Sequence, residues 1–314
     1  MIAFGPVPSR RLGRSLGINN MPPKCCSYSC IYCQIGRTVR RRIERRKFFE
    51  PERILREVEL HLVKLRETGE PIDYLTFVPS GEPTLDKNLG REIQALASLG
   101  IKVGVITNAS ILWREDVRAD LAEAYWVSLK IDAATEKAWR KLNRPHPALK
   151  MSSVIDGLIR FAKSFRGDLV TETMLVRGVN DEAGRLQELS DLLDQVNPRC
   201  CYLATPTRPP AESWVLPPTA EVLSECYSLL AARLPAVECL TAGDEGQFTV
   251  TRSAVQDLLS ITAVHPMEEE AVEKFLQKAG ADWTLIERLL ENGRIIKTEF
   301  EGKQFYRKAP ATVL

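Results

Sequence analysis

The sequence predicts an α/β fold, a partial (β/α)6 barrel followed by a small winged-helix-like α+β domain. Apolar runs of strand length alternate with helical patterns from about residue 13 to residue 240, which is typical of parallel strands joined by right-handed helical connections. About six such units fit, fewer than the eight of a full barrel. Beyond Gly246 the pattern changes, so we expect a barrel domain over residues 1–245 and a second domain over residues 246–314.

Six strands are expected in the barrel domain, each a short apolar run of strand length. They are Ser15–Asn19, Tyr74–Val78, Lys102–Ile106, Ala124–Ile131, Leu169–Val176 and Cys200–Ala204. The first helix is marked by Ile54, Val58, Leu62 and Leu65, which share one helical face. The other helices are expected at Asn88–Leu99, Thr135–Leu142, Ser152–Ser164, Asp181–Val196 and Thr219–Leu234.

The sequence pattern of the C-terminal part predicts three helices and a β-hairpin. The helices are Thr251–Ser260, Glu268–Lys278 and Trp283–Asn292, and the strands are Arg294–Phe300 and Lys303–Lys308 around a Glu301-Gly302 turn. This order suggests a winged helix, a fold that often binds DNA through its basic third helix. Residues 268–308 hold nine acidic and eight basic residues. We therefore expect no DNA partner, and rather a lid, a dimer contact or a docking surface for a protein.

Composition excludes several classes of protein. The chain has 314 residues, of which 44% are hydrophobic and 27% are charged, so disorder, collagen-like repeats and coiled coils are not expected. No stretch approaches the roughly 20 apolar residues that cross a bilayer, and the N-terminus has no secretory signal pattern. We expect a soluble cytoplasmic protein with no membrane partner.

One short segment is strongly basic, although the net charge of the chain is only +2. Between Arg37 and Lys47 the only acidic residue is Glu44, and the basic residues are Arg37, Arg40, Arg41, Arg42, Arg45, Arg46 and Lys47. Such a segment is either a contact for nucleic acid or phosphate, or a solvated surface covered by long side chains.

Four of the eight cysteines fall between Cys25 and Cys33, which in a cytoplasmic chain indicates a metal site more than a set of disulfides. Cys26, Cys30 and Cys33 have C-x3-C-x2-C spacing. Thiolates select zinc, copper(I) or iron–sulfur centres, and structural zinc usually takes four ligands in two separated pairs. Three ligands would leave one iron of a 4Fe–4S cluster open to another molecule.

With these cysteines, the sequence resembles the radical SAM superfamily, whose cluster motif carries an aromatic residue before its last cysteine, here Tyr32. Other signatures follow in the family's order, at the expected C-terminal ends of strands. Ser80–Thr84 (Ser-Gly-Glu-Pro-Thr) is similar to the family's G-G-E-P motif, and the later signatures are Thr107-Asn108, Ser128 and Lys130 with Asp132, and Arg177–Asp181. The resemblance covers roughly residues 1–240 and implies a partial TIM-like barrel of the radical SAM type.

Within the superfamily the chain most resembles a branch similar to wyosine-type tRNA-modifying enzymes. The segments that carry this resemblance are Phe4–Gly13, Cys33–Thr38 and Pro206–Pro210. One departure is the absence of cysteine upstream of Cys25, where wyosine-forming members carry ligands for a second cluster. The tRNA substrate is therefore kept as an alternative to a small-molecule or protein substrate.

The resemblance implies a 4Fe–4S cluster on Cys26, Cys30 and Cys33, with S-adenosylmethionine (SAM) on the fourth iron. The implied SAM contacts are Tyr32, Ser80, Gly81, Glu82, Thr107, Asn108, Ser128, Lys130 and Arg177. A salt bridge to a neighbouring strand is the alternative for Lys130. The implied partners are a reductant such as flavodoxin or ferredoxin and an unassigned substrate, and no catalytic residue is assigned. A zinc-binding regulatory protein is the non-enzymatic alternative.

Several further residues are candidates for weaker reasons. Arg208, after the last expected strand, is a candidate contact for an anionic substrate. The Arg144–Pro147 segment, with His146, either lines the substrate entrance or forms a surface loop. No role is assigned to the remaining cysteines, Cys25, Cys200, Cys201, Cys226 and Cys239, because burial as a free thiol is the common state of such residues.

Overall fold

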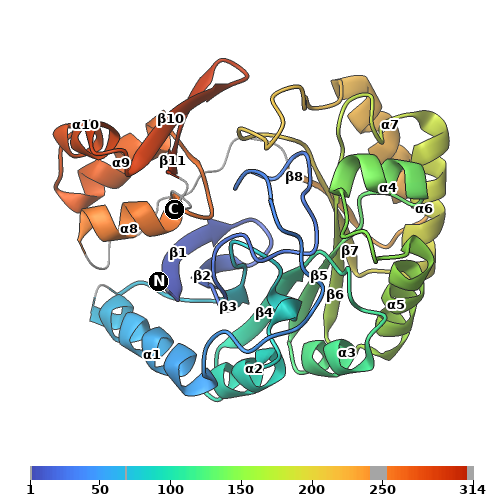
Figure 1. The fold of residues 1–314 in the computed structure, drawn as a ribbon, viewed down its shortest axis with the longest axis horizontal. Helices are drawn as coiled ribbons and strands as arrows, with labels where there is room; N and C mark the ends of the chain where they lie inside the picture. Colours follow the sequence, from blue (N-terminus) through green and yellow to red (C-terminus); the bar gives the residue numbers. More distant parts are fainter. Residues whose placement is uncertain (1, 68, 241–252, 310–314) are drawn as a thin grey trace.

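The computed structural model describes residues 2–67, 69–240 and 253–309 (Figure 1). Its centre is a curled sheet of eight strands in the order β1 to β8, open between β1 and β8. The strands are β1 (Ala3–Ser9), β2 (Gly13–Ile18), β3 (Tyr74–Phe77), β4 (Lys102–Thr107), β5 (Trp126–Lys130), β6 (Asp168–Met174), β7 (Cys200–Ala204) and β8 (Val237–Leu240). Strand β1 is antiparallel to β2, and β2 to β8 are mutually parallel. The sheet confirms the predicted partial barrel.

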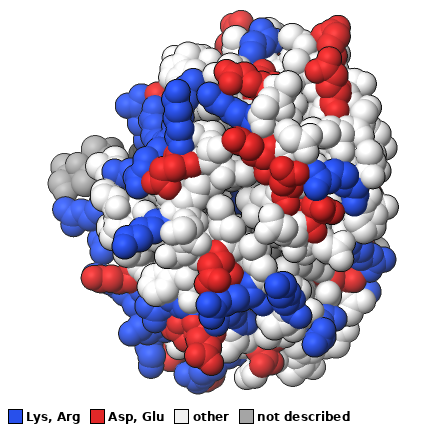
Figure 2. Space-filling model, turned by 90° about the vertical axis from the view of Figure 1, so that its right-hand side faces the viewer, with Lys and Arg blue, Asp and Glu red and all other residues white. Residues whose placement is uncertain are grey.

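Helices cover the outer face of the curled sheet (Figure 1). They are α1 (Pro51–Glu67), α2 (Leu89–Ala97), α3 (Glu115–Ala122), α4 (Glu136–Asn143), α5 (Met151–Ser164), α6 (Ala183–Val196) and α7 (Ala220–Ala231). Each buries one apolar stripe against the strands, as Ile54 and Val58 do on α1. On the side of α4 to α7, basic and acidic side chains are intermixed (Figure 2). No helix in the described ranges is long and apolar enough to cross a membrane.

The six predicted strands and six predicted helices of the barrel are present, with ends shifted by a few residues. Strands β1 and β8 and helix α3 were not predicted. Strand β1 contains Pro6 and Pro8, which hide the strand pattern but are tolerated because β1 lies at an edge of the sheet. Helix α3 buries only Val117 and Leu121, too few to mark a helical period.

The C-terminal region forms a smaller unit with its own core. It comprises α8 (Ala254–Ile261), β9 (Met267–Glu268), α9 (Glu269–Ala279), α10 (Thr284–Glu291), β10 (Ile295–Phe300) and β11 (Lys303–Lys308). The strands form an antiparallel sheet in the order β10-β11-β9, over buried Phe275, Ile286 and Tyr306. The three helices and the hairpin are confirmed, and the winged helix stays a prediction. The proposed boundary at residues 245 and 246, and the start of the helix predicted from Thr251, lie outside the described residues.

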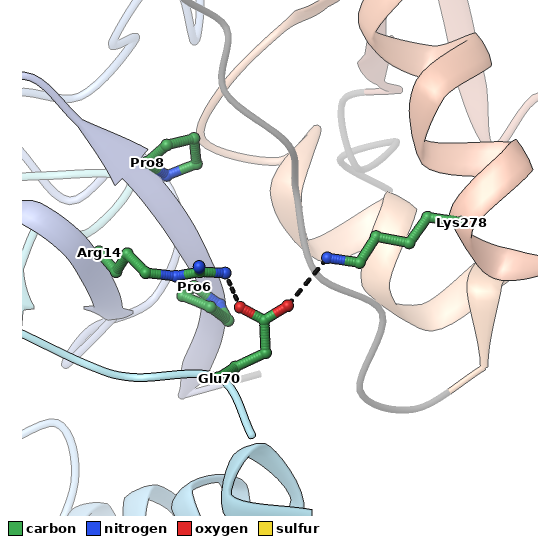
Figure 3. Close-up of a pocket in the computed structure, with 5 residues that line it drawn as sticks. All are labelled: Pro6, Pro8, Arg14, Glu70 and Lys278. Carbon is green, nitrogen blue, oxygen red and sulfur yellow. Dashed lines mark hydrogen bonds and ion pairs between the residues drawn. The ribbon is translucent and has the colours of Figure 1, made fainter. Parts of the chain in front are cut away.

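This C-terminal region lies beside strand β1, at the open edge of the curled sheet (Figure 1). Val7 of β1 packs against its core, and Lys278 at the end of α9 pairs with Glu70 through an Nζ–Oε1 distance of 2.9 Å. Glu70 also pairs with Arg14 of β2, so its carboxylate lies between the two cations (Figure 3). With Pro6 and Pro8 these residues line a cavity of about 200 Å³.

A buried pair of carboxyls lies at the start of α2. Glu92 is fully buried, and Asn20 Nδ2 donates to its Oε2 at 3.0 Å. Burial and the nearby Asp86 raise the pKa of Glu92 to about 9. Because the pKa is above its ordinary value of 4.5, the contribution of this carboxyl to stability is present at low pH and is lost as the pH rises toward 9.

A Glu92→Gln variant is therefore expected to flatten this pH dependence. Glutamine keeps the acceptor for Asn20 and carries no charge, so the free energy of unfolding at pH 8 should rise by about 1–2 kcal/mol. Denaturant unfolding between pH 5 and pH 9 measures the effect, with exposed Glu67→Gln as the control. An equally steep decline in wild type and Glu92→Gln would contradict the assignment.

Candidate functional site

A cavity of about 520 Å³ opens inside the curled sheet, at the C-terminal ends of its strands. The ends of β4, β5, β6 and β7 contribute Thr107, Lys130, Met174 and Ala204. The predicted cysteines also line it, and they are Cys26, Cys30 and Cys33. The sheet therefore brings the strand-end motifs and the cysteine loop to one place, as the sequence predicted.

Each of these three sulfurs accepts one N–H hydrogen bond from a different segment of the chain. The pairs are Asn108 Nδ2 with Cys26 Sγ at 3.5 Å, Asn143 Nδ2 with Cys30 Sγ at 3.5 Å, and Lys24 Nζ with Cys33 Sγ at 3.7 Å. Such donors stabilise sulfur that carries negative charge. Neither Lys24 nor Asn143 was predicted, because their distance to the sulfurs depends on how the loops fold.

The thiols fit a cluster ligand set by chemistry and by surroundings. Burial raises the pKa of the Cys30 thiol to about 12 and that of the Cys26 thiol well above its ordinary value. Without a metal both thiols therefore stay protonated, and a cluster would have to displace these protons when it binds. Among the described residues, no group of three or more His, Cys, Asp or Glu side chains is placed to hold a single metal ion. A 4Fe–4S cluster does not need such a group, because each cysteine binds a different iron.

The residues around Asn143 fix Tyr32 in the cavity wall. Asn143 Nδ2 donates to Asp132 Oδ2 at 2.8 Å, and the Tyr32 hydroxyl donates to the same oxygen. The Lys130 ammonium lies 4.9 Å from the centre of the Tyr32 ring. Tyr32 thus presents its ring to the cavity with its hydroxyl already satisfied, which is the arrangement expected of a side chain that packs against a ligand.

Gly81 is pressed against the cysteine loop. A Cβ at this position would lie 2.2 Å from the Cys25 carbonyl oxygen and 2.6 Å from Met21 Sδ. The neighbouring Glu82 N–H donates to the same Cys25 carbonyl at 2.9 Å. The Ser-Gly-Glu-Pro-Thr turn therefore supports the loop that carries the cysteines, and only glycine allows this approach.

The Glu82 carboxylate is 1% exposed and receives four hydrogen bonds. Thr84 donates through N at 3.1 Å and Oγ1 at 2.6 Å, Thr107 through Oγ1 at 2.6 Å, and Asn108 through N at 2.7 Å. Burial raises the pKa of Glu82, and the bonds from Thr107 and Thr84 oppose the rise. Gly81, Glu82, Thr107 and Asn108 all line the cavity, and together they form one hydrogen-bonded wall.

Lys130 forms the salt bridge to a neighbouring strand that was the alternative to a SAM contact. Its Nζ pairs with Glu172 Oε1 at 2.6 Å, directly across from it on β6, and Arg11 also pairs with Glu172. Lys130 still lines the cavity. Ser128, two residues earlier on the strand, is buried and does not line it, and its Oγ has no hydrogen-bond partner among the residues described.

Besides Ser128, two more predicted contacts do not line the cavity. Arg177 is exposed, and its Nε donates to the Pro217 carbonyl at 2.9 Å. The inward residue of that loop is Asn180, whose Nδ2 donates to the Asp132 and Met174 carbonyls, each at 2.8 Å. Ser80 is buried and acts through its backbone, because its carbonyl accepts from Lys24 N at 2.7 Å. Neither Arg177 nor Ser80 lines the cavity.

The basic segment is partly used to hold the fold. Arg45 is buried and pairs with Asp116 and Asp120. Arg41 donates to the Arg144 and Pro145 carbonyls at 3.0 and 2.9 Å. Arg208 lines the cavity as its candidate role requires, and His146 does not. None of the five cysteines without an assigned role lines the cavity.

Comparison with known proteins agrees with this site. Residues 21–189, more than half of the chain, match the family model of the Radical SAM superfamily. A UPF0026 protein of Methanocaldococcus jannaschii is 43% identical over 309 residues, which cover 98% of this chain and 96% of that protein. A second UPF0026 protein, from Helicobacter pylori, is 30% identical over 313 residues, 97% of each chain.

A solved structure gives the same fold. TYW1 with a lysine-pyruvate adduct bound aligns with a TM-score of 0.55 and 18% identity, over 71% of this chain and 76% of that one. Members of the matched superfamily are enzymes that bind a 4Fe–4S cluster and SAM and need a reductant. The chain therefore belongs to the radical SAM superfamily, within the UPF0026 family.

Proposed function

We propose that the chain holds one 4Fe–4S cluster through Cys26, Cys30 and Cys33 and uses it to cleave SAM. When bound, the cluster and SAM would supply one-electron cleavage of a carbon–sulfur bond, with the electron from a reductant, and so the means to abstract a hydrogen atom from a substrate. The observation that carries the proposal is the set of three sulfurs, each with its own N–H donor, at the wall of a cavity large enough for a cofactor and a substrate.

The chain's own residues would bind and orient SAM. Glu82 offers a carboxylate to an ammonium group, and Gly81 allows a backbone approach. Thr107 and Asn108 are candidates for the ribose or the carboxylate, and Tyr32 for the adenine. Lys130 is a candidate for the SAM carboxylate, which its ammonium group would contact while it also pairs with Glu172. Ser128, two residues earlier on the same strand, would support the cavity wall at Lys130.

A Glu82→Gln variant tests this wall. Loss of the negative charge is expected to raise the Kd for SAM about 10–100-fold, while Thr84 and Thr107 keep an acceptor in the glutamine oxygen. The Kd is measured by calorimetry on reconstituted protein, and 5′-deoxyadenosine formation with dithionite is measured in parallel. An unchanged Kd would remove Glu82 from the SAM site, and wild-type protein that has a full cluster but forms no deoxyadenosine would refute the function.

The reductant is proposed to be an acidic one-electron carrier such as flavodoxin or ferredoxin. Arg42 N donates to the Cys26 carbonyl at 2.9 Å, so the basic segment lies directly beside the cluster loop, and Arg40 and Lys47 are exposed on it. Replacing Arg40 and Lys47 with glutamate should slow flavodoxin-supported turnover about 10-fold or more and leave dithionite-supported turnover unchanged. Equal rates with flavodoxin in both proteins would place the carrier elsewhere.

We propose a small molecule or a protein side chain as the substrate. In the basic segment that favoured tRNA, Arg41 and Arg45 make contacts within the fold, which leaves fewer cations for phosphate contacts.

We further propose that residues 1–245 form the catalytic domain and residues 246–314 a lid. All eight cysteines are free, which agrees with a reducing compartment, the cytoplasm.

A further inference from the structure

Lys24 occupies a backbone conformation that favours glycine or asparagine. Its φ is +59°, in the left-handed region that residues with a Cβ rarely adopt. Two hydrogen bonds to the Ser-Gly-Glu-Pro-Thr turn hold the backbone there. Lys24 N donates to the Ser80 carbonyl at 2.7 Å, and the carbonyl of the next residue, Cys25, accepts from Glu82 N at 2.9 Å. Residues kept in such conformations cluster at functional sites, which directs attention to the Lys24 side chain.

The Lys24 ammonium group contacts both ends of the turn that begins at the last predicted cluster cysteine. Gly36 N donates to the Cys33 carbonyl at 2.9 Å and closes this turn. Lys24 Nζ lies 3.7 Å from Cys33 Sγ and also donates to the Gly36 carbonyl. Lys24 is half-buried and does not line the cavity. The ammonium group is therefore fixed at the Cys33 sulfur without taking up room where cluster and SAM would bind.

Of the three N–H donors to the cysteine sulfurs, Lys24 is the one that carries a charge. The other two are the side-chain amides of Asn108 and Asn143. The reduction potential of an iron–sulfur cluster depends on the net charge around it and on the hydrogen bonds to its sulfurs. An added electron brings one negative charge to the cluster, so a cation beside a ligand sulfur stabilises the reduced state more than the oxidised state.

We propose that Lys24 is a positioning residue for the cluster, which holds a positive charge at the Cys33 sulfur and so raises the reduction potential of the cluster. The inference rests on the proposed function and deepens it, because a cluster that cleaves SAM must first take an electron from its reductant. Without this cation the three cysteine ligands remain and reduction becomes harder. Lys24 therefore sets how strong a reductant the protein requires.

The experiment is a redox titration of the reconstituted full chain without SAM, followed by electron paramagnetic resonance of the reduced cluster. Lys24→Gln keeps a polar side chain and loses the charge. At a fixed potential its ratio of reduced to oxidised cluster should fall about 10-fold or more, which corresponds to about 59 mV for one electron. Lys24→Arg keeps the charge, and its ratio should stay within about threefold of wild type.

Lys87→Gln is the matched control. Lys87 lies just after the Ser-Gly-Glu-Pro-Thr turn, is exposed and does not line the cavity. Its replacement removes the same charge from the same part of the chain at a position where solvent and salt screen it. The ratio of reduced to oxidised cluster in Lys87→Gln should therefore equal that of wild type.

Three outcomes would overturn the proposal: an unchanged ratio in Lys24→Gln, an equal fall in Lys24→Arg, or an equal fall in Lys87→Gln. If Lys24→Gln takes up no cluster, uptake by Lys24→Arg would support the need for the charge, and loss in both variants would overturn it. Deoxyadenosine formation by wild type with excess dithionite reports separately on the proposed function. A cluster whose potential depends on Lys24 but which forms no deoxyadenosine would refute that function alone.

Discussion

A Cys30→Ala variant is expected to lose the cluster and to form no measurable 5′-deoxyadenosine. Even the loss of outer partners of a metal site costs about 10–100-fold in affinity or activity, and Cys30 is proposed as one of only three protein ligands. Its sulfur lies in the cavity wall and accepts from Asn143, so alanine removes the ligand while Asn143 keeps its bond to Asp132. Iron and sulfide analysis after anaerobic reconstitution measures the loss.

Cys239→Ser is the matched control. Cys239 lies on β8 and does not line the cavity, so iron content and deoxyadenosine formation should equal those of wild type. Wild-type iron content in Cys30→Ala would contradict the assignment of this ligand. Equal loss in both variants would mean that the effect comes from general misfolding.

A Gly81→Ala variant is expected to disturb the fold and the site together. The added Cβ would overlap the Cys25 carbonyl oxygen at 2.2 Å, and a backbone atom cannot rotate away as a side chain does. Overpacking typically costs about 1–3 kcal/mol, and here relief requires the cysteine loop to move. We expect a free energy of unfolding lower by at least about 2 kcal/mol and poor cluster incorporation.

Gly184→Ala is a suitable control because, apart from its chain neighbours and its own helix backbone, no atom of the described residues lies within 4 Å of its Cβ position. This residue lies in the first turn of α6, where alanine changes stability by no more than about 1 kcal/mol. Denaturant unfolding of the proteins without cluster separates the effect on the fold from the effect on the cluster. Equal stability of Gly81→Ala and wild type would contradict the tight contact.

The sequence predicted those elements whose pattern lies within a short segment of the chain. Six strands, their helices and the C-terminal hairpin follow from periodicity, and the cysteine spacing locates the site. Strand β1 was not predicted because its two prolines conceal a strand that has only one partner. Strand β8 was not predicted because its sequence, Val-Glu-Cys-Leu, is not a continuous apolar run and only Val237 of it is buried. A neighbour on the sheet, rather than local sequence, stabilises both strands.

The site was less predictable where a side chain depends on distant neighbours. Asn143 meets Cys30 across 113 positions of the chain, and His265 joins the cavity wall from the C-terminal region. Periodicity carries no trace of either contact. Arg177 was expected to face SAM because of its place in a family motif, yet its loop turns the guanidinium outward to Pro217. For Lys130, strand register places Glu172 opposite it, so the salt bridge is present, and its contact with SAM stays a proposal.

The most direct test of the central claim is electron paramagnetic resonance of the reduced, reconstituted protein with and without SAM. A cluster held by three cysteines leaves one iron open, so the account predicts a 4Fe–4S signal that changes shape when SAM is added, in protein with about four irons per chain. A signal that SAM leaves unchanged, or zinc in place of iron in protein purified without oxygen, would contradict it.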